Sequence, residues 1–238
     1  MKEICFETIS STNAYLKENY ANLDDFTIVS SKIQTSGRGR NDRIWYSEKN
    51  NLLFSLLIKD RNYFNKFKKI SIVSAYSILS VLKEYGIDNL SIKWPNDVYI
   101  DDKKVCGILL ESVSKQELEC LIVGIGINVN QTIFNDDYLV KPTSIKLATH
   151  KEIDLNEFKN NIYERLIENI RLIDTKDFYD EICKYDFLKG KEVYACINNK
   201  KELVKVLCIN DDYSLKVKLK DEILNVETGE ISFHIWGG

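Results

Sequence analysis

The chain has 238 residues, of which 44% are hydrophobic and 29% are charged, and its formal net charge is −3. This balance is that of a globular protein and excludes a disordered or fibrous chain. The slight negative charge excludes binding of polyanions through an overall positive field, so any anion site has to be local. No apolar run reaches the length of a signal peptide or a membrane helix, which favours a cytoplasmic protein that does not enter the membrane.

The first part of the chain predicts short strands and one helix. Strands are expected at Met1–Phe6 and Phe26–Ser31. Between them, the segment SSTN supplies capping hydroxyl groups for a helix at Ala14–Asn19. The apolar run LLFSLLI, Leu52–Ile58, is typical of a strand that is buried on both faces. Residues 34–47 therefore form a loop that connects strands of the core.

The centre of the chain predicts a long helix followed by a meander of strands. Lys69–Tyr85 repeats apolar residues every three or four positions and stops before a glycine, as an amphipathic helix does. Polar turns such as DDKK then separate short apolar segments, which indicates antiparallel strands. These strands are expected at Leu90–Trp94, Val98–Ile100, Val105–Ser112 and Leu118–Ile127. Helices are expected again at Glu152–Ile173 and Asp174–Cys183.

Beyond residue 186 the pattern changes to strands of about five residues separated by polar turns. These strands are expected at Glu192–Ile197, Leu203–Ile209, Leu215–Leu219, Glu222–Asn225 and Ile231–His234. Such a pattern predicts a small β-barrel. We therefore expect an α+β fold, in which a mixed or antiparallel central sheet with flanking helices occupies residues 1–186 and a small C-terminal β-barrel occupies residues 187–238.

The common metal and nucleotide signatures are absent from the sequence. The six cysteines form no C-x-x-C pair and only two histidines are present, which argues against a zinc site and a disulfide framework. The segments GRGRND and GIGINVN each lack the third glycine of G-x-G-x-x-G, and no G-x-x-x-x-G-K-[ST] occurs. Neither a dinucleotide-binding fold of that kind nor a P-loop is indicated.

Residues 34–47, QTSGRGRNDRIWYS, concentrate glycine and arginine in one loop, which we call the Gly/Arg loop. Gly37 and Gly39 allow the backbone to approach a ligand closely. Three arginines accompany them: Arg38, Arg40 and Arg43. Their planar guanidinium groups suit carboxylate or phosphate oxygens. From this segment alone, an anion pocket and a solvated basic loop are equally open interpretations, and a nucleic-acid contact is a third.

A second group of polar side chains lies in residues 91–112, SIKWPNDVYIDDKKVCGILLES. The turn WPND places Lys93, Asn96 and Asp97 at the end of a strand. If the next strand pairs back as a hairpin, the carboxylate of Asp97 comes close to the amine of Lys104. A plain turn followed by a solvated hairpin tip is the alternative interpretation.

Six segments, in their order and at their intervals, resemble those of biotin protein ligases, also called biotin–acetyl-CoA-carboxylase ligases. The segments are SSTN, QTSGRGRNDRIWYS, KWPNDV, KKVCGILLES, GIGINVN and PTSI. The resemblance spans most of the chain and implies the class II synthetase-like catalytic domain of that family, followed by its small barrel. Some relatives carry an N-terminal helix-turn-helix that binds DNA. Few residues precede SSTN, so we expect no DNA-binding domain here.

The resemblance also implies an activity. Members of the family use ATP to activate biotin as biotinyl-5′-AMP with release of pyrophosphate, and Mg²⁺ assists this step. They then transfer biotin to one lysine of a biotin carboxyl carrier protein domain. A lipoate or octanoate ligase or transferase of related fold is one alternative, and a non-catalytic biotin-binding module is another. The arginines together with Lys104 and Asp97 favour an enzyme, and the oligomeric state, a homodimer included, stays open.

The matching positions imply three groups of site residues. Biotin would be bound by Ser11, Thr12, Asn13, Gln34, Gly37, Arg38, Lys104 and Gly107. ATP and the adenylate would be bound by Arg38, Arg40, Arg43, Trp45, Lys93, Asn96 and Asn128. Catalysis would fall to Lys104, Arg40 and Asp97, and Asp97 would also contact the Mg²⁺ that accompanies the phosphates.

The Gly/Arg loop departs from the family pattern at one position. Asp42 stands where most relatives have glycine, and it adds a negative charge beside a phosphate site. The mixed anhydride is prone to hydrolysis, so the site needs a cover that excludes water. We hypothesise that residues 36–44 are mobile in the ligand-free protein and become ordered over bound biotin.

Overall fold

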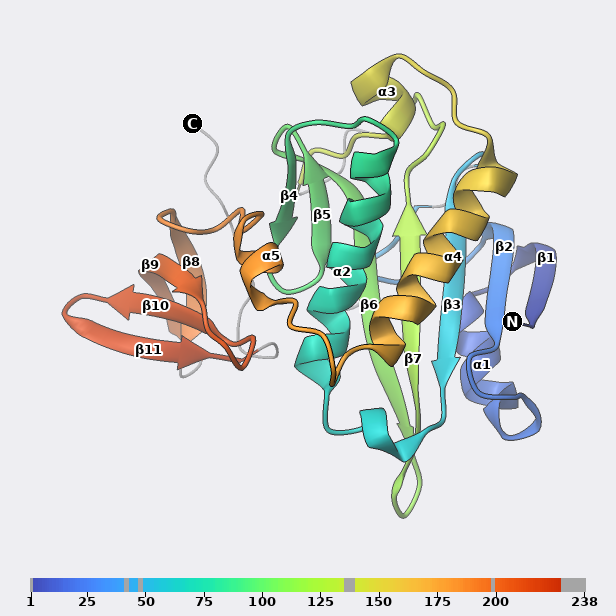
Figure 1. The fold of residues 1–238 in the computed structure, drawn as a ribbon, viewed down its shortest axis with the longest axis horizontal. Coiled ribbons are helices and arrows are strands. Elements are labelled where there is room, and N and C mark those ends of the chain that lie inside the picture. Colours follow the sequence, from blue (N-terminus) through green and yellow to red (C-terminus); the bar gives the residue numbers. More distant parts are fainter. Residues whose placement is uncertain (1, 41–42, 47–48, 135–139, 198–199, 228–238) are drawn as a thin grey trace.

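The computed structural model describes residues 2–40, 43–46, 49–134, 140–197 and 200–227, and it contains a large sheet, helices on both of its faces and a smaller C-terminal sheet (Figure 1). The strands of the large sheet are β1 (Glu3–Ile9), β2 (Ile28–Gln34), β3 (Leu52–Ile58), β4 (Leu90–Lys93), β5 (Asp97–Ile100), β6 (Lys103–Ser114) and β7 (Leu118–Ile127). The α-helices are α1 (Thr12–Asn19), α2 (Phe67–Glu84), α3 (Ile145–Thr149), α4 (Leu155–Arg171) and α5 (Tyr179–Cys183). The strands of the small sheet are β8 (Glu192–Ile197), β9 (Lys200–Ile209), β10 (Leu215–Leu219) and β11 (Glu222–Val226).

The large sheet has the strand order β1-β2-β3-β7-β6-β5-β4. The edge strand β1 pairs with β2 in parallel, and the other neighbouring strands pair antiparallel. This arrangement confirms the prediction of a mixed central sheet. Every residue of β3 is buried, which confirms the strand predicted from the run LLFSLLI.

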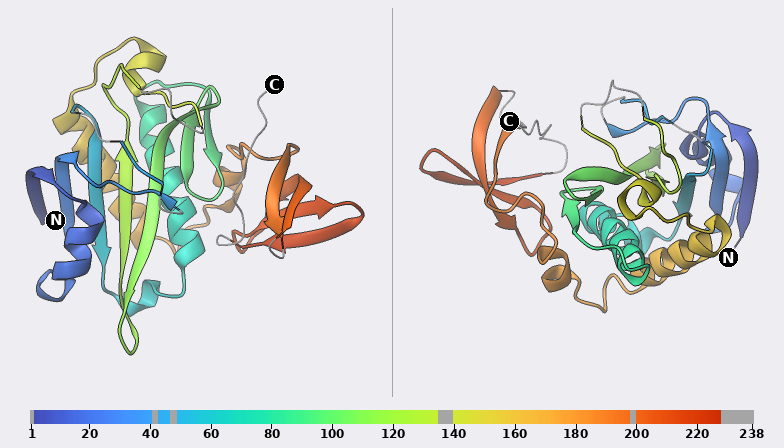
Figure 2. Two further views of the ribbon diagram at one scale, coloured as in Figure 1. Left: turned by 180° about the vertical axis from the view of Figure 1, so that it is seen from behind. Right: turned by 90° about the horizontal axis from the view of Figure 1, so that it is seen from above.

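The two faces of the large sheet are covered by different helices. Helices α2 and α4 cross one face (Figures 1 and 2), where their apolar side chains pack with Phe54 and Val123 in the main core. Leu16 of α1 packs instead with Leu57 and Ile122 in a smaller core. Because successive side chains of a strand point to opposite faces, α1 lies on the face that α2 and α4 leave free. The same face carries the candidate site.

The helix ends follow from local capping bonds. Asp154 caps α4, because its Oδ1 accepts hydrogen bonds from the two backbone N–H groups at Asn156 and Glu157. The helix predicted over Asp174–Cys183 is wrong in its first half, because only α5 is helical. Oδ1 of Asp177 accepts the backbone N–H of Tyr179 at 2.9 Å, a local bond that competes with a continuous helix. In the parts of the chain that the structure describes, no helix is both long and apolar enough to cross a membrane.

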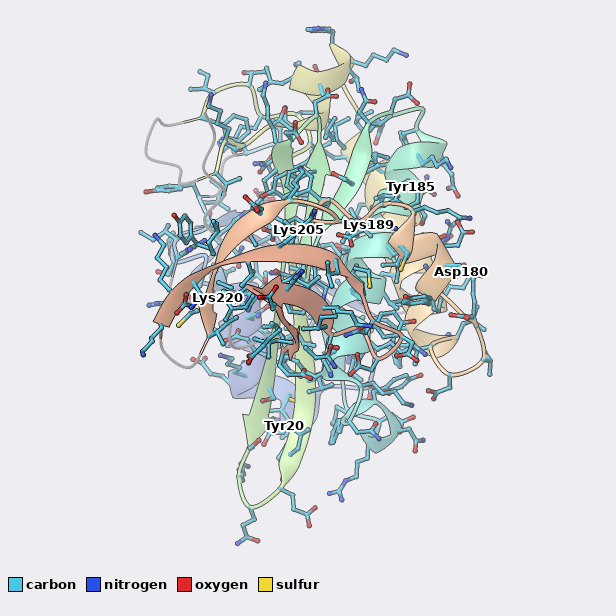
Figure 3. The ribbon with its side chains drawn as sticks, turned by 90° about the vertical axis from the view of Figure 1, so that its left-hand side faces the viewer. Tyr20, Asp180, Tyr185, Lys189, Lys205 and Lys220 are labelled. Atoms are coloured by element: carbon cyan, nitrogen blue, oxygen red, sulfur yellow. The ribbon has the colours of Figure 1, made fainter. Side chains whose placement is uncertain are left out.

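The C-terminal strands form a four-stranded sheet over the described residues, and its closure into the predicted barrel stays a prediction. Their order is β11-β10-β9-β8, with β8 and β11 at opposite edges over the described residues. The apolar face of these strands, with Val193, Val206 and Val217, packs into the main core. Figure 3 views the molecule from the side of this sheet, which carries Lys205. The predicted fifth strand, Ile231–His234, lies outside the described residues, and the domain boundary after residue 186 stays a prediction.

Candidate active site

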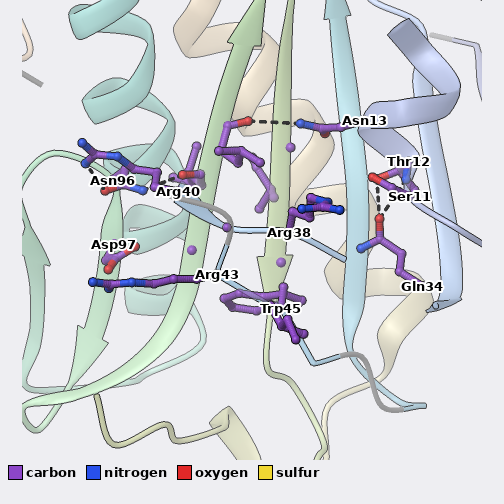
Figure 4. Close-up of a pocket in the computed structure, with 18 of the residues that line it drawn as sticks. Ser11, Thr12, Asn13, Gln34, Arg38, Arg40, Arg43, Trp45, Asn96 and Asp97 are labelled. Carbon is purple, nitrogen blue, oxygen red and sulfur yellow. Dashed lines mark hydrogen bonds between the residues drawn. The ribbon is translucent and has the colours of Figure 1, made fainter. Parts of the chain in front are cut away.

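A cavity of about 550 Å³ lies over the face of the large sheet that α2 and α4 leave free (Figure 4). Almost all of the predicted site residues line it: Ser11, Thr12, Asn13, Gln34, Arg38, Arg40, Arg43, Trp45, Lys93, Asn96, Asp97, Lys104, Gly107 and Asn128. The exception is Gly37, which is buried and does not line the cavity. Its carbonyl oxygen accepts a hydrogen bond from the backbone N–H of Trp45 at 3.0 Å, so this glycine shapes the loop.

Strand register explains why residues distant in the sequence meet on this face. Across the sheet, Lys93 pairs with Asp97, and Asp97 pairs with Gly107. Gly107 pairs in turn with Gly126, which pairs with Leu53. Paired residues of neighbouring strands point to the same face. This row therefore places a cation, a carboxylate and two residues without side chains next to one another.

Trp45 of the Gly/Arg loop lies on these two glycines. A Cβ atom added at Gly107 would come within 2.8 Å of its ring, and one added at Gly126 would come within 2.5 Å. The Lys104 amine lies 5.5 Å from the ring centroid, as in a cation–π contact. Among the described residues, the buried indole N–H has no hydrogen-bond partner. The glycines thus make room for an apolar wall inside the cavity.

One end of the cavity carries neutral hydrogen-bonding groups from α1 and β2. Ser11 caps α1, and its Oγ accepts the backbone N–H of Ala14 at 3.3 Å. Oε1 of Gln34 accepts the backbone N–H of Thr12 at 2.8 Å. The amide nitrogen of Gln34 therefore remains for a ligand, and Figure 4 shows it on the side of the cavity. Uncharged donors and acceptors of this kind suit a polar ring without net charge.

A hydrogen-bond network that the sequence did not reveal adjoins this end, and its charged members, Lys17 and Glu111, also line the cavity. Oγ1 of Thr12 lies 2.6 Å from Oγ of Ser55, which donates a hydrogen bond to Oδ1 of Asn13. Nδ2 of Asn13 donates to Glu111 at 2.7 Å, and Nζ of Lys17 donates to the same carboxylate at 2.6 Å. Ser55 is a polar residue within the apolar run LLFSLLI, and this was the signal that could have pointed to it.

The opposite end of the cavity carries the charged groups. Nζ of Lys104 lies 2.8 Å from Oδ1 of Asp97, which confirms the proximity predicted from the hairpin. Nη1 of Arg40 donates to Oδ1 of Asn96 at 3.3 Å. Nδ2 of Asn96 donates to the carbonyl oxygen of Ile108 at 2.6 Å, which fixes the orientation of its amide. Figure 4 shows Arg40, Asn96 and Asp97 on the far side of the cavity from Gln34.

Burial acts on two of the cations. It lowers the pKa of Lys93, whose charge Asp97 supports and Lys104 opposes. Burial also lowers the pKa of Arg40. The negative charge of Asp97 partly opposes this shift, and the positive charge of Arg43 adds to it. Both shifts arise because desolvation disfavours the charged form. A bound anion would relieve this penalty, so this end of the cavity favours negatively charged ligand groups.

The segment around PTSI holds the backbone of Lys104 in place. The backbone N–H of Lys104 donates to the carbonyl oxygen of Lys141 at 3.0 Å. The carbonyl oxygen of Lys104 accepts the backbone N–H of Thr143 at 2.9 Å. Nδ2 of Asn128 donates to the carbonyl oxygen of Thr143 at 3.0 Å. Asn128 thus supports the lysine from behind while it lines the cavity.

The charged end does not contain a metal site built from protein groups alone. Over the described residues, no group of three or more His, Cys, Asp or Glu side chains could hold an ion. Asp97 is a single carboxylate that is paired with Lys104. Mg²⁺ commonly binds through one or two carboxylates together with substrate phosphates. Asp97 fits such an ion only when the ligand supplies the remaining oxygens.

The Gly/Arg loop folds back on itself at the cavity. The backbone N–H of Gly39 donates to the carbonyl oxygen of Arg43 at 2.7 Å, and Arg38 forms an isolated bridge with Ile44. Asp42, the departure from the family pattern, lies outside the described residues. The hypothesis that residues 36–44 become ordered over biotin therefore stays a prediction.

The comparisons with known proteins agree with this site. The model of the Biotin/lipoate A/B protein ligase family matches residues 5–128. The bifunctional ligase/repressor BirA of Bacillus subtilis (strain 168) is 34% identical over 137 residues, which cover 56% of this chain and 42% of that protein. The biotin–[acetyl-CoA-carboxylase] ligase of Paracoccus denitrificans is 34% identical over 125 residues, which cover 50% of this chain and 51% of that protein. The structure of the biotin protein ligase from Aquifex aeolicus in complex with biotin and ATP superposes with a TM-score of 0.87 at 31% identity, over 98% of each chain.

A cavity with neutral hydrogen-bonding groups at one end and cations at the other suits a small ligand that carries both neutral polar groups and an acid group. The family match and the Aquifex aeolicus structure make this more specific: the chain belongs to the biotin/lipoate A/B protein ligase family. The chain spans about half the length of the curated relatives it matches.

Proposed function

We propose that the chain is an ATP-dependent biotin protein ligase. It joins biotin and ATP to biotinyl-5′-AMP with release of pyrophosphate, and then transfers biotin to a lysine of a biotin carboxyl carrier protein domain. The observation that carries the proposal is one cavity with neutral hydrogen-bonding groups at one end and a cluster of cations at the other. The complex of the Aquifex aeolicus ligase with biotin and ATP supports it.

The neutral end is the proposed site for the ureido ring of biotin. Ser11, Thr12 and Gln34 offer hydrogen bonds to this ring, and a buried polar group left unpaired would cost about 1 to 3 kcal/mol. The apolar part of the ligand would lie against Trp45, which points the acid group toward the cations. This orientation is what a ring with a carboxylate tail requires.

The charged end of the cavity would offset the repulsion between the biotin carboxylate and the phosphates of ATP, which is the main obstacle to adenylate formation. A biotin carboxylate oxygen attacks the α-phosphorus of ATP, the bond from that phosphorus to pyrophosphate breaks, and pyrophosphate leaves with the electron pair. Two like charges about 4 Å apart repel by about 4 kcal/mol at an effective dielectric of 20. Lys104, Arg40 and Arg43 line this end and offset the repulsion. Arg38 and Lys93 line the same cavity and add positive charge.

The second step needs a neutral amine from the carrier lysine. The amine attacks the acyl carbon of the anhydride, the bond to the phosphate oxygen breaks, and AMP leaves. Asp97 is the proposed group that orients this amine and accepts its proton. Lys104, 2.8 Å away, holds the carboxylate in position.

Mg²⁺ is proposed to enter with the nucleotide. Asp97 would contact an ion that the phosphates hold, and the ion would supply positive charge at the leaving pyrophosphate. Asn96, beside Asp97, is proposed to bind a phosphate oxygen or a water of that ion. The arginines and lysines do the remaining charge compensation.

One experiment separates the proposed function from its alternatives. The protein is incubated with Mg²⁺, α-labelled ATP and either biotin, lipoate or octanoate, and the labelled products are separated. A labelled adenylate with biotin alone supports the proposal. An adenylate with lipoate or octanoate instead would support the related ligases, and biotin binding without any adenylate would leave a binding module. Addition of a carrier domain with and without its acceptor lysine then tests the transfer.

A further inference from the structure

A continuous chain of hydrogen bonds runs along the end of the cavity that carries Ser11, Thr12 and Gln34, and all of its members except Ser55 line the cavity. It leads from Lys17 through Glu111, Asn13 and Ser55 to Thr12. The last three side chains are 7%, 0% and 2% exposed, respectively, so water does not compete for their hydrogen bonds. Each buried donor must therefore find its acceptor within the chain.

Glu111 determines which group donates in the first hydrogen bond of this network, the one between Asn13 and Glu111. A carboxylate accepts hydrogen bonds and donates none, so Asn13 has to turn its NH₂ group toward it. The carbonyl oxygen of Leu109, 3.5 Å from the same nitrogen, favours the same orientation. The amide oxygen of Asn13 then faces Ser55 and can only accept, which commits the single proton of the Ser55 hydroxyl.

The second direction follows from the first. Because the Ser55 proton is committed to Asn13, the 2.6 Å contact between Ser55 and Thr12 has to use the proton of the Thr12 hydroxyl. This contact is shorter than the 3.2 Å approach of the same hydroxyl to Oε1 of Gln34. The hydroxyl oxygen of Thr12 thus keeps lone pairs for the cavity. Gln34, whose oxygen holds the backbone N–H of Thr12, keeps its NH₂ group.

We infer that Glu111 is a positioning residue that makes the hydroxyl oxygen of Thr12 a hydrogen-bond acceptor toward the ligand. Beside it, Gln34 presents a donor, because the backbone N–H of Thr12 holds its amide oxygen. A urea offers the complement, an N–H group and a C=O group side by side. The choice of urea as ligand group rests on the proposed function, whereas the directions of the hydrogen bonds rest on the structure.

Gly124 shows that the place of the Asn13 amide on the sheet is built into the fold. A Cβ atom at this position would lie 2.2 Å from Oδ1 and 2.8 Å from Nδ2 of Asn13. The strand therefore leaves a place for the amide on the sheet, next to Ser55. Lys17, paired with the outer oxygen of Glu111, balances the charge of the carboxylate.

An exchange of the amide at position 13 and the carboxylate at position 111 tests this inference. Asn13→Asp alone sets two carboxylates against each other, and Glu111→Gln alone lets the amide of Asn13 turn either way. The double variant Asn13→Asp/Glu111→Gln restores a donor facing an acceptor, because the introduced glutamine donates to the introduced aspartate. The aspartate still accepts from Ser55, so the directions at Ser55 and Thr12 are those of the wild type. Glu117→Gln, at an exposed glutamate, is the matched control.

The first measurement is the dissociation constant for biotin by titration calorimetry, with thermal unfolding to confirm that each variant is folded. We expect each single variant to bind about tenfold more weakly and the double variant to regain at least about threefold of the affinity that the weaker single variant loses. A merely structural role for Glu111 would make the double variant at least as weak as the weaker single variant. That outcome, or wild-type affinity in Glu111→Gln, would overturn the inference.

The second measurement is made without ligand, so that it does not depend on the proposed function. Solvent exchange of the side-chain amide protons of Asn13 is followed by NMR in the wild type and in Glu111→Gln. We expect the side-chain amide protons of Asn13 to exchange slowly in the wild type and faster in the variant. Equal exchange in both proteins would contradict the inference. Failure of the wild type to bind biotin, together with slow exchange, would contradict the proposed function and leave the hydrogen-bond directions standing.

Discussion

The amine of Lys104 on β6 lies 2.8 Å from the carboxylate of Asp97 on β5, and a register shift between Val98 and Tyr99 allows the two to meet. Their side chains are 25% and 18% exposed, so the pair lies at the wall of the cavity rather than in bulk water. In the ligand-free protein the carboxylate offsets the charge of the amine. A ligand carboxylate or phosphate can share the same amine once it arrives.

Replacement of Lys104 by alanine tests the contribution of this cation. Removal of a group that stabilises charge in a transition state commonly slows the chemical step by roughly 10² to 10³ fold, and we expect a loss of that size in adenylate formation. The measurement is single-turnover formation of labelled adenylate. Lys103→Ala, at the exposed neighbouring residue, is the matched control and should keep the wild-type rate. A wild-type rate in Lys104→Ala would remove this lysine from the mechanism.

A double-variant cycle tests the contact between Gly126 and Trp45. An added methyl group at Gly126 would lie 2.5 Å from the indole, so Gly126→Ala should displace the ring and weaken biotin binding by about tenfold or more. In the background of Trp45→Ala the clash is gone, and the same substitution should then cost little. Biotin dissociation constants for the four proteins give the coupling. Strictly additive effects would show that the indole does not lie on this glycine in solution.

Sequence patterns predicted those parts of the site whose contacts are local. Asp97 and Lys104 lie in one hairpin, so turn residues and strand length were enough to predict that they meet. Ser55 and Glu111 were missed because they act across the sheet: Ser55 bonds with Asn13, 42 residues away, and Glu111 bonds with the same residue, 98 residues away. Such contacts depend on strand register, which the periodicity of one strand does not contain.

In the fold, too, local features were predicted from the sequence and long-range contacts were not. The run LLFSLLI and the period of α2 were sufficient to predict a buried strand and a helix, because burial and period are properties of a single segment. Closure of the C-terminal strands into a barrel stays a prediction, because the predicted fifth strand, Ile231–His234, lies outside the described residues. The apolar face of the C-terminal strands packs against the main core through Val206 and Val217, and no pattern within those strands predicts this contact.

Trp94 links the C-terminal sheet to the turn that carries Asn96 and Asp97. Its indole N–H donates to the carbonyl oxygen of Tyr213 at 2.9 Å, in a buried contact. Trp94→Phe would leave that oxygen unpaired, and we expect a loss of about 1 to 3 kcal/mol in the free energy of unfolding. Urea unfolding measures it. Tyr213→Phe keeps the backbone carbonyl and should lose less, and an equal or larger loss in this control would show that the hydrogen bond is not the stabilising contact.

The carboxylate of Glu3 gives the edge strand β1 a defined dependence on pH. Burial raises the pKa of Glu3, but hydrogen bonds from Lys159 and Ser30 outweigh it, so the folded-state pKa lies below the ordinary 4.5. The stabilisation is therefore complete above pH 4.5 and is lost as the pH falls through the lower, folded-state value. We expect Glu3→Gln to cost about 1 to 2 kcal/mol at pH 7 and progressively less below pH 4.5, as measured by urea unfolding across this range. Glu7→Gln, which removes an exposed partner of Lys32, should cost little at any pH. A cost of Glu3→Gln that stays constant down to pH 3 would mean that these hydrogen bonds do not favour the ionised carboxylate.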